Sequence, residues 1–318
     1  MELAPKAYRY SEEIRKESHR LGFDRVGITE AVPLKAEASR LQTWLHEGRH
    51  ADMDWMKENV EKRSNPLTVL PSAKSIVVVA MNYYTDHVHD DGPRKGKISR
   101  YAWGDDYHDV VKERLDKLLE FIRSFEPAVD GKVYVDTGPV LEKAWAQRAG
   151  IGWQGKHTNL ITEDFGSWVF LGEILLNLEL VYDAPDTDRC GSCTLCIEAC
   201  PTQAITEPYV LDAGKCISYL TIEHRGEIEP ALAAKFDGWI YGCDICQDAC
   251  PWNQRNAHIT ARKEFEPRSG NIAPELEDIA SLSVGEFQKR FRKSPIKRAK
   301  HSGLTRNATL LMKTRQKS

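Results

Sequence analysis

Apolar residues between positions 105 and 125 recur at the spacing of an amphipathic helix. They follow one another at steps of four, three and four (Val111, Leu115, Leu118, Ile122), which places them on one helix face. Residues 75–84 and 168–178 are instead largely apolar runs. Runs of this length and composition favour buried strands.

Shorter segments complete an alternation of helices and strands. Ser11 is placed to cap a helix that Gly22 ends. We expect further helices at residues 34–47 and 140–149, and further strands at residues 25–29 and 132–136. Strands that alternate with helices predict an α/β domain whose sheet is covered by helices.

The chain has 318 residues, which at ~150 residues per domain predicts about two domains. Residues 182–189 are polar and rich in turn formers, so we expect a junction there. No apolar run approaches the ~20 residues that span a bilayer, and the N-terminus lacks the apolar core of a secretion signal. We therefore expect a cytoplasmic protein without a membrane partner, and nothing in the sequence demands more than a monomer.

Charge is distributed unevenly along the chain. Lys and Arg number 44 against 47 Asp and Glu, a net charge of −3. Residues 287–318 nevertheless hold 11 Lys and Arg and no acidic residue. Such asymmetry is typical of proteins that bind a polyanion, nucleic acid above all. A solvated, frayed tail is the alternative, and charge alone does not separate the two.

All eight cysteines fall between residues 190 and 250. The first run has the spacing C-x2-C-x2-C-x3-C-P and ends at Cys200 and Pro201. This is the ligand run of bacterial ferredoxins, in which the fourth cysteine serves the other cluster. The second run, which ends at Cys250, lacks its first cysteine because Ile240 stands there, and Cys216 is the spare thiol that replaces it.

The crossover rule then divides the thiols into two sets of four, one for each [4Fe–4S] cluster. Structural zinc is the alternative, because four cysteines per site also suit that ion. The spacing, followed by proline in both runs, favours iron–sulfur clusters. The first set is Cys190, Cys193, Cys196 and Cys250, and the second is Cys200, Cys216, Cys243 and Cys246.

Asp136 ends an apolar strand and precedes Thr137, Gly138 and Pro139. A carboxylate at the carboxyl end of a strand faces the crevice where α/β sheets bind ligands, although a plain helix cap is an equally simple role. His108 and His157 are weaker candidates, because a lone histidine near a helix start is more often structural than catalytic.

Long motifs give the chain a family resemblance. They include SRYAWGDDYHD at residues 99–109, VDTGPVLEKAWAQRAGIGWQGKH at 135–157 and GSWVFLGEILLN at 166–177. KCISYLTIE surrounds Cys216, and YGCDICQDACPWN contains the second cysteine run. Through these motifs the chain resembles the epoxyqueuosine reductases over about residues 8 to 310, effectively its whole length.

The resemblance implies a fold and a reaction. The expected architecture is an α/β (α+β) cobalamin-binding domain like that of reductive dehalogenases, then a two-cluster ferredoxin-like domain and a basic helical C-terminal segment. The expected boundaries are 1–182, 183–262 and 263–318. The implied reaction reduces an epoxide on the modified wobble base of tRNAs for Tyr, His, Asn and Asp. It implies cobalamin and two [4Fe–4S] clusters as cofactors and an external low-potential electron donor.

The resemblance also implies roles for individual residues. Asp136 matches the proposed general acid of the family, which also places it beside the cobalamin. Some relatives carry cysteine at the position of Ser99, so a thiolate there is not needed for the mechanism. Longer relatives continue into a helical-repeat region after the position where this sequence stops. The other residues that match cobalamin contacts are Arg63, Ser99, Leu160, Ser218, Asp244 and Ile245.

Three other functions remain to be weighed. A two-cluster electron carrier would have no use for so large an α/β domain. A reductive dehalogenase acting on a small molecule usually carries a twin-arginine export signal, which is not found here. The third alternative is a nucleic-acid-binding protein whose clusters are structural. Under this hypothesis Asp136→Asn would leave function intact.

Overall fold

The computed structural model describes residues 5–316. Its α/β body is built on a four-stranded sheet with the strand order β1-β2-β7-β4. The strands are β1 (Arg25–Glu30), β2 (Ser75–Asn82), β7 (Val169–Leu176) and β4 (Gly131–Tyr134). Every pairing in this sheet is antiparallel, so the body is of the α+β type.

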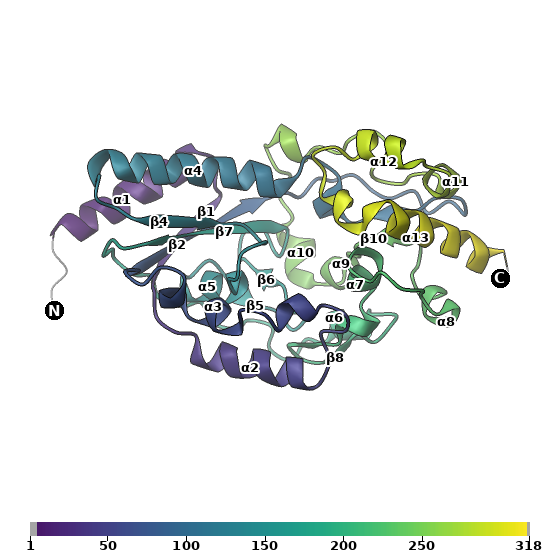
Figure 1. The fold of residues 1–318 in the computed structure, drawn as a ribbon, viewed down its shortest axis with the longest axis horizontal. Coiled ribbons are helices and arrows are strands. Elements are labelled where there is room, and N and C mark those ends of the chain that lie inside the picture. Colours follow the sequence, from purple (N-terminus) through teal and green to yellow (C-terminus); the bar gives the residue numbers. More distant parts are fainter. Residues whose placement is uncertain (1–4, 317–318) are drawn as a thin grey trace.

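Helices cover both faces of the sheet (Figure 1). Side chains on β2 alternate: Val77 and Val79 pack under α1 and α4, while Ile76 and Val78 join the core of the opposite face. Because successive strand residues point to opposite faces, a wholly apolar strand indicates a sheet buried on both sides. The helices are α1 (Pro5–Arg20) and α4 (Tyr107–Phe125) on one face, and α2 (Lys35–His46), α3 (Val60–Ser64) and α5 (Glu142–Arg148) on the other.

Most sequence-based elements are found within a few residues of their predicted bounds, but α1 begins earlier than expected. Ser11 lies inside the helix, where its hydroxyl donates to the carbonyl of Ala7 at 2.8 Å and accepts from the backbone N–H of Val181 at 2.8 Å. The prediction that Ser11 caps the helix is therefore wrong. A buried serine that ties two segments together has the same sequence signature as a cap.

The cysteine-bearing region consists of short helices and two-stranded ribbons. Hairpin β5 (Trp153–Gln154) and β6 (Leu160–Ile161) reaches it from the body. The hairpin packs against Cys250, with Cys190 beside it. The region's other elements are α6 (Leu195–Glu198), β8 (Ile205–Glu207), β9 (Val210–Leu211), α7 (Ile217–Ile222), α9 (Ile245–Asp248) and α10 (Pro251–Asn256).

The C-terminal helices are packed rather than frayed. Leu304, Ala308 and Leu311 of the last helix are buried in a core that also contains Trp239 and Tyr241. The basic segment is therefore part of the folded protein, and the division into three domains stays a prediction. This part contains β3 (Lys97–Ile98), α8 (Pro230–Ala233), β10 (Trp239–Tyr241), α11 (Leu276–Ala280), α12 (Val284–Arg290) and α13 (Lys300–Arg315). No helix among residues 5–316 is long and apolar enough to cross a membrane.

Candidate active site

Asp136 lies in the turn between β4 and α5 in a left-handed conformation, with φ of +55°. An L-residue adopts this conformation rarely, so neighbouring groups must hold it. The carboxylate of Glu142 does so by accepting a hydrogen bond from the backbone N–H of Asp136 at 2.5 Å. The sheet is antiparallel, so the crevice argument for parallel sheets does not explain the position of Asp136. The turn and its partners do.

His108 lies between two carboxylates. Its Nδ1 is 2.7 Å from Oδ1 of Asp106, and its Nε2 is 3.1 Å from Oδ2 of Asp136. Asp106 also caps α4 by accepting from the backbone N–H of His108 at 3.2 Å. Beside Asp106 a groove of about 340 Å³ opens, with Lys293 at its rim. The helix start thus fixes the imidazole, and the imidazole in turn contacts the candidate acid.

The pKa values of His108 and Asp136 are shifted in opposite directions. Burial disfavours the charged imidazole, but the hydrogen bonds to Asp106 and Asp136 outweigh it and raise the pKa of His108 to about 9. Burial also favours the neutral acid at Asp136, yet His108 outweighs it and lowers the pKa of Asp136. At neutral pH the resting pair is therefore an imidazolium beside a carboxylate.

Two further carboxyl groups lie behind Asp136. Glu173 is fully buried on the central strand β7, and no described residue satisfies its carboxyl oxygens with standard hydrogen-bond geometry. Burial and the neighbouring charge of Glu142 raise the pKa of Glu173 well above its usual range. Burial and Asp136 raise the pKa of Glu142 to about 7. The Glu142–Glu173 pair therefore retains a proton at neutral pH.

Lys143 connects Asp136 with the cysteines. Burial lowers the pKa of Lys143, while Asp136 and the thiols of Cys246 and Cys216 favour its charged form. The side chain is nevertheless exposed, and the side chain of Asp136 is 56% exposed. Nζ of Lys143 donates to the carbonyl of Thr158 at 3.1 Å and to Oδ1 of Asn159 at 2.9 Å. We call the solvent-accessible space at Asp136 and Lys143 the recess, and the thiols that act on Lys143 belong to the second cysteine set.

The thiols of the cysteines influence one another's charge, and their division into two ligand sets stays a prediction. Burial raises the pKa of the Cys196 thiol to about 11, and Cys250, Cys190 and Cys193 add to this effect. Burial and the thiols of Cys216 and Cys200 likewise raise the pKa of Cys246, and Cys243 interacts with both Cys246 and Cys216. Such effects act over short distances. They link thiols within each expected set of four, the composition that a [4Fe–4S] cluster requires, and they also link Cys246 to Cys196 of the other set.

The residues expected to contact cobalamin fall into two groups. Ser99 and Asp244 are buried and hydrogen-bonded to each other. The backbone N–H groups of Ser218 and Ile245 interact with the thiols of Cys216 and Cys243.

Arg63 and Leu160 lie in the α/β body. Arg63 stacks on Trp55 at 5.3 Å, and its Nε is buried with no partner among the described residues. Leu160 belongs to the core beneath the sheet.

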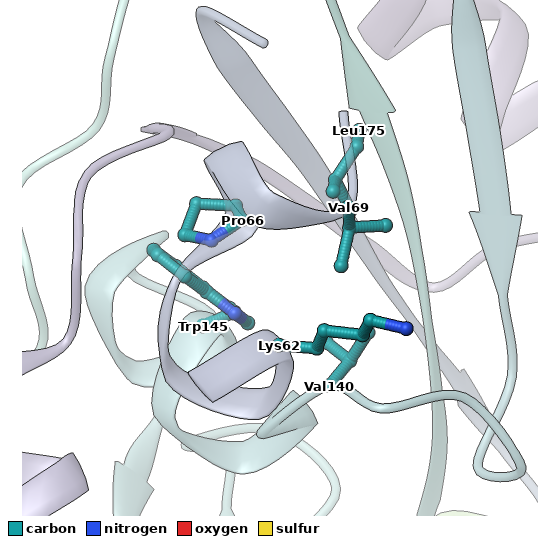
Figure 2. A pocket seen from close by; sticks show the side chains of 6 residues that line it. All are labelled: Lys62, Pro66, Val69, Val140, Trp145 and Leu175. Atoms are coloured by element: carbon teal, nitrogen blue, oxygen red, sulfur yellow. The ribbon is translucent and has the colours of Figure 1, made fainter. Parts of the chain in front are cut away.

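These placements fit a cofactor in part: an unpaired guanidinium N–H suits a polar group of a large ligand. His157 does not join the acid site. It is buried, and burial lowers its pKa to about 4, which keeps the ring neutral. The pocket in Figure 2, between Lys62, Pro66, Val69, Val140, Trp145 and Leu175, has about 10 Å³ of free space and is no substrate site.

Two family models match the chain. One, described as "Epoxyqueuosine reductase QueG, DUF1730", covers residues 63–137, and the other, a "4Fe-4S double cluster binding domain", covers residues 189–253. Over 272 residues the sequence is 52% identical to the epoxyqueuosine reductase of Synechocystis sp., with 85% of this chain and 93% of that protein aligned. The chain belongs to the epoxyqueuosine reductase family. The double-cluster match also favours iron–sulfur clusters over zinc at the cysteines.

Other members of the family align with nearly the whole of this chain and share its fold. The epoxyqueuosine reductase of Cellulophaga algicola is 45% identical over 303 residues, which cover 95% of this chain and 98% of that protein. A crystal structure of an epoxyqueuosine reductase with a tRNA-Tyr epoxyqueuosine-modified stem loop superimposes with a TM-score of 0.92 at 33% identity. It covers 98% of this chain and 82% of the crystallised one. The fold expected from the family resemblance is confirmed.

Proposed function

We propose that this protein reduces epoxyqueuosine to queuosine at the wobble position of tRNAs for Tyr, His, Asn and Asp. The reaction consumes two electrons and two protons and yields an alkene and water. The observation that best supports this function is the contact between His108 and Asp136. It lies at the recess, where Lys143 interacts with Asp136 and with the second cysteine set. Family membership and the related stem-loop complex support the substrate.

The chain's own residues supply the proton. An oxygen that leaves carbon as an anion is a poor leaving group unless an acid protonates it. His108 holds a proton against Asp136, whose carboxylate faces the recess. We assign Asp136 the role of delivering this proton to the epoxide oxygen and His108 that of replacing it. The second proton also ends on that oxygen, so that it departs as water.

The cofactors supply the electrons. Cobalamin, when bound, provides a strongly reducing cobalt centre, and iron–sulfur clusters provide single electrons. Eight cysteines in two sets of four would hold the clusters, and Arg63 and Leu160 would contact the cobalamin from the body side. Ser99, Ser218, Asp244 and Ile245 would border it from the cysteine side. An external low-potential donor, a cytoplasmic location and a monomeric state stay predictions.

The basic segment would bind the phosphates of the tRNA. Lys297 and Lys300 are exposed and form no ion pair within residues 5–316. The neighbouring Arg298 is close enough to Asp136 for that carboxylate to influence its charge, although its main partner is Glu223 at 2.6 Å. Basic side chains therefore border the recess that would receive the modified base.

One experiment tests substrate, cofactor and reaction together. The anoxically reconstituted protein is incubated with epoxyqueuosine-containing tRNA and a strong reductant, with and without cobalamin, and the nucleosides are analysed by mass spectrometry. We expect loss of one oxygen atom that depends on cobalamin. Conversion without added or bound cobalamin would remove the cofactor from the proposal, and no conversion by a protein with both clusters loaded would contradict the function.

A further inference from the structure

A lysine of the α/β body reaches into the ligand loop of the first cysteine set. Lys156 follows the β5 strand, and its side chain is buried. Its Nζ donates hydrogen bonds to the backbone carbonyls of Gly191 at 2.6 Å and Cys193 at 2.9 Å. Gly191 follows the first ligand and Cys193 is the second, so the ammonium group is fixed to the backbone of the ligand loop.

The charge of Lys156 has no ion-pair partner within 4 Å among the described residues. Asp188, two residues before Cys190, directs its oxygens to the backbone N–H of Cys190 at 2.8 Å and to the hydroxyl of Tyr209 rather than to Lys156. A buried charge without a paired charge is costly. A [4Fe–4S] cluster with four thiolate ligands carries net negative charge and would neutralise this ammonium group.

The same hairpin places an indole beside the ligands of the first set. Trp153 packs in a small cluster with Cys250, and Cys190 lies against that cluster. Trp153 is fully buried, and its Nε1 finds no partner of standard geometry within the described residues. Its ring packs edge-on against Trp252 at 4.7 Å. An enclosed N–H beside a ligand thiol suits a cluster sulfur as its acceptor.

We propose that Lys156 and Trp153 are positioning residues that raise the reduction potential of the cluster held by Cys190, Cys193, Cys196 and Cys250. Reduction adds one negative charge to the cluster. A fixed positive charge and an N–H donor stabilise that added charge, and both are recognised determinants of cluster potentials. The proposal rests on the proposed function only in assuming that these cysteines hold a cluster that accepts single electrons.

Within the described residues, the hydrogen bonds of Lys156 Nζ go to the first cysteine set alone. Lys143 donates instead to the carbonyl of Thr158 at 3.1 Å and to Oδ1 of Asn159 at 2.9 Å, in the turn of the hairpin. Changing Lys156 should therefore shift one cluster and leave the other in place, a selectivity that general loss of stability would not produce.

The test is an EPR-monitored redox titration of the anoxically reconstituted holoprotein, with iron and sulfide counted for each variant. We expect Lys156→Met to lower the reduction equilibrium constant of one cluster about tenfold, which is about 59 mV for a one-electron couple. Lys156→Arg should stay near the wild type, because it keeps the charge. Trp153→Phe should shift the same cluster in the same direction by a smaller amount.

Lys132→Met is the matched control. Lys132 also donates to a backbone carbonyl, that of Val69 at 2.6 Å, but it lies on β4 in the sheet. Unchanged potentials for both clusters in a fully loaded Lys156→Met protein would overturn the proposal. If Lys156→Met loses a cluster, the test uses Trp153→Phe, with Lys156→Arg as the variant that keeps the charge. Equal cluster potentials in Trp153→Phe and the wild type would then overturn the proposal. Shifted potentials without turnover would instead contradict the proposed function alone.

Discussion

Nε2 of His108 lies 3.1 Å from Oδ2 of Asp136, across 28 residues of sequence. The contact joins the first turn of α4 to the turn after β4, and Asp106 orients the imidazole from its other side at 2.7 Å. The proposed general acid is thus in contact with a group that is protonated at neutral pH. Under the proposed function, His108 supplies the proton that Asp136 delivers.

The pH dependence of turnover should report His108. Its pKa is raised to about 9, so the stored proton is present at neutral pH and is lost as the pH rises through about 9. We expect the single-turnover rate to fall over that range. In His108→Gln the fall should occur at lower pH, because Asp136 then holds the proton without its partner. The rate itself should decrease by about 10²-fold, within the range for general acid catalysis.

His19→Gln provides the control for the pH measurement. His19 contacts the carbonyl of Phe23 at 3.1 Å, at the end of α1, and has no contact with the site. Its profile should match the wild type. An unchanged profile in His108→Gln would assign the proton to another group.

Asp136→Asn should separate chemistry from binding. The amide retains the shape of the carboxylate but does not deliver a proton, so turnover should fall by about 10² to 10⁴-fold while the affinity for tRNA is unchanged. Quenched single-turnover assays and fluorescence anisotropy measure the two quantities on one preparation. Asp130→Asn, just before β4, is the control. Equal turnover in Asp136→Asn would remove this residue from the mechanism.

Glu142 should affect turnover by holding the backbone of Asp136 in place. It accepts the N–H of Asp136 and so supports a φ of +55°. Loss of one such hydrogen bond costs about 1 kcal/mol, so Glu142→Ala should lower kcat by about fivefold with little change in KM. Glu142→Gln keeps an acceptor oxygen and should recover most of the rate at neutral pH. If both variants behaved alike, the turn would not depend on this hydrogen bond.

The sequence predicts the chemistry of this protein better than it predicts the geometry. The spacing of the cysteines predicts a double-cluster domain, which the family match at residues 189–253 supports, because a cluster imposes its own local pattern; the assignment of the eight ligands stays a prediction. Helix α4 is predicted by the helical spacing of its apolar residues. The contact between His108 and Asp136 depends instead on how β4 and α4 pack, and neither residue's neighbours in sequence reveal it. The antiparallel order β1-β2-β7-β4 is equally invisible, since strand spacing does not encode pairing.

Buried charges are the second feature that pattern reasoning misses. Glu173 interrupts the apolar run of β7, a strand that is buried on both faces. Hydropathy averaged over the run hides this single acidic residue. Lys156, in the turn between β5 and β6, carries no comparable signal. Its partners are carbonyls of residues 35 and 37 positions away.

Glu173 should make the protein less stable as the pH rises. Burial and Glu142 raise its folded-state pKa well above the usual range, whereas the unfolded chain ionises at an ordinary value. Stability from the neutral carboxyl is therefore complete below about pH 4 and declines as the pH increases towards the folded-state pKa. Glu173→Gln should raise the thermal midpoint at pH 8 and change it little at pH 4.5. Glu179→Gln, just after the sheet, is the control, and a pH-independent difference would contradict this assignment.

Binding of tRNA should depend steeply on salt through the basic segment. Lys297 and Lys300 are exposed and flank Arg298. Each phosphate contact contributes slightly less than one unit to the slope of log K against log salt. We expect Lys297→Glu combined with Lys300→Glu to weaken binding and to reduce that slope by about one to two units. Lys16→Glu on α1, at the opposite end of the molecule (Figure 1), should leave both unchanged. An unaltered salt dependence in the double variant would show that the tRNA phosphates bind elsewhere, because each lost phosphate contact lowers the slope of log K against log salt.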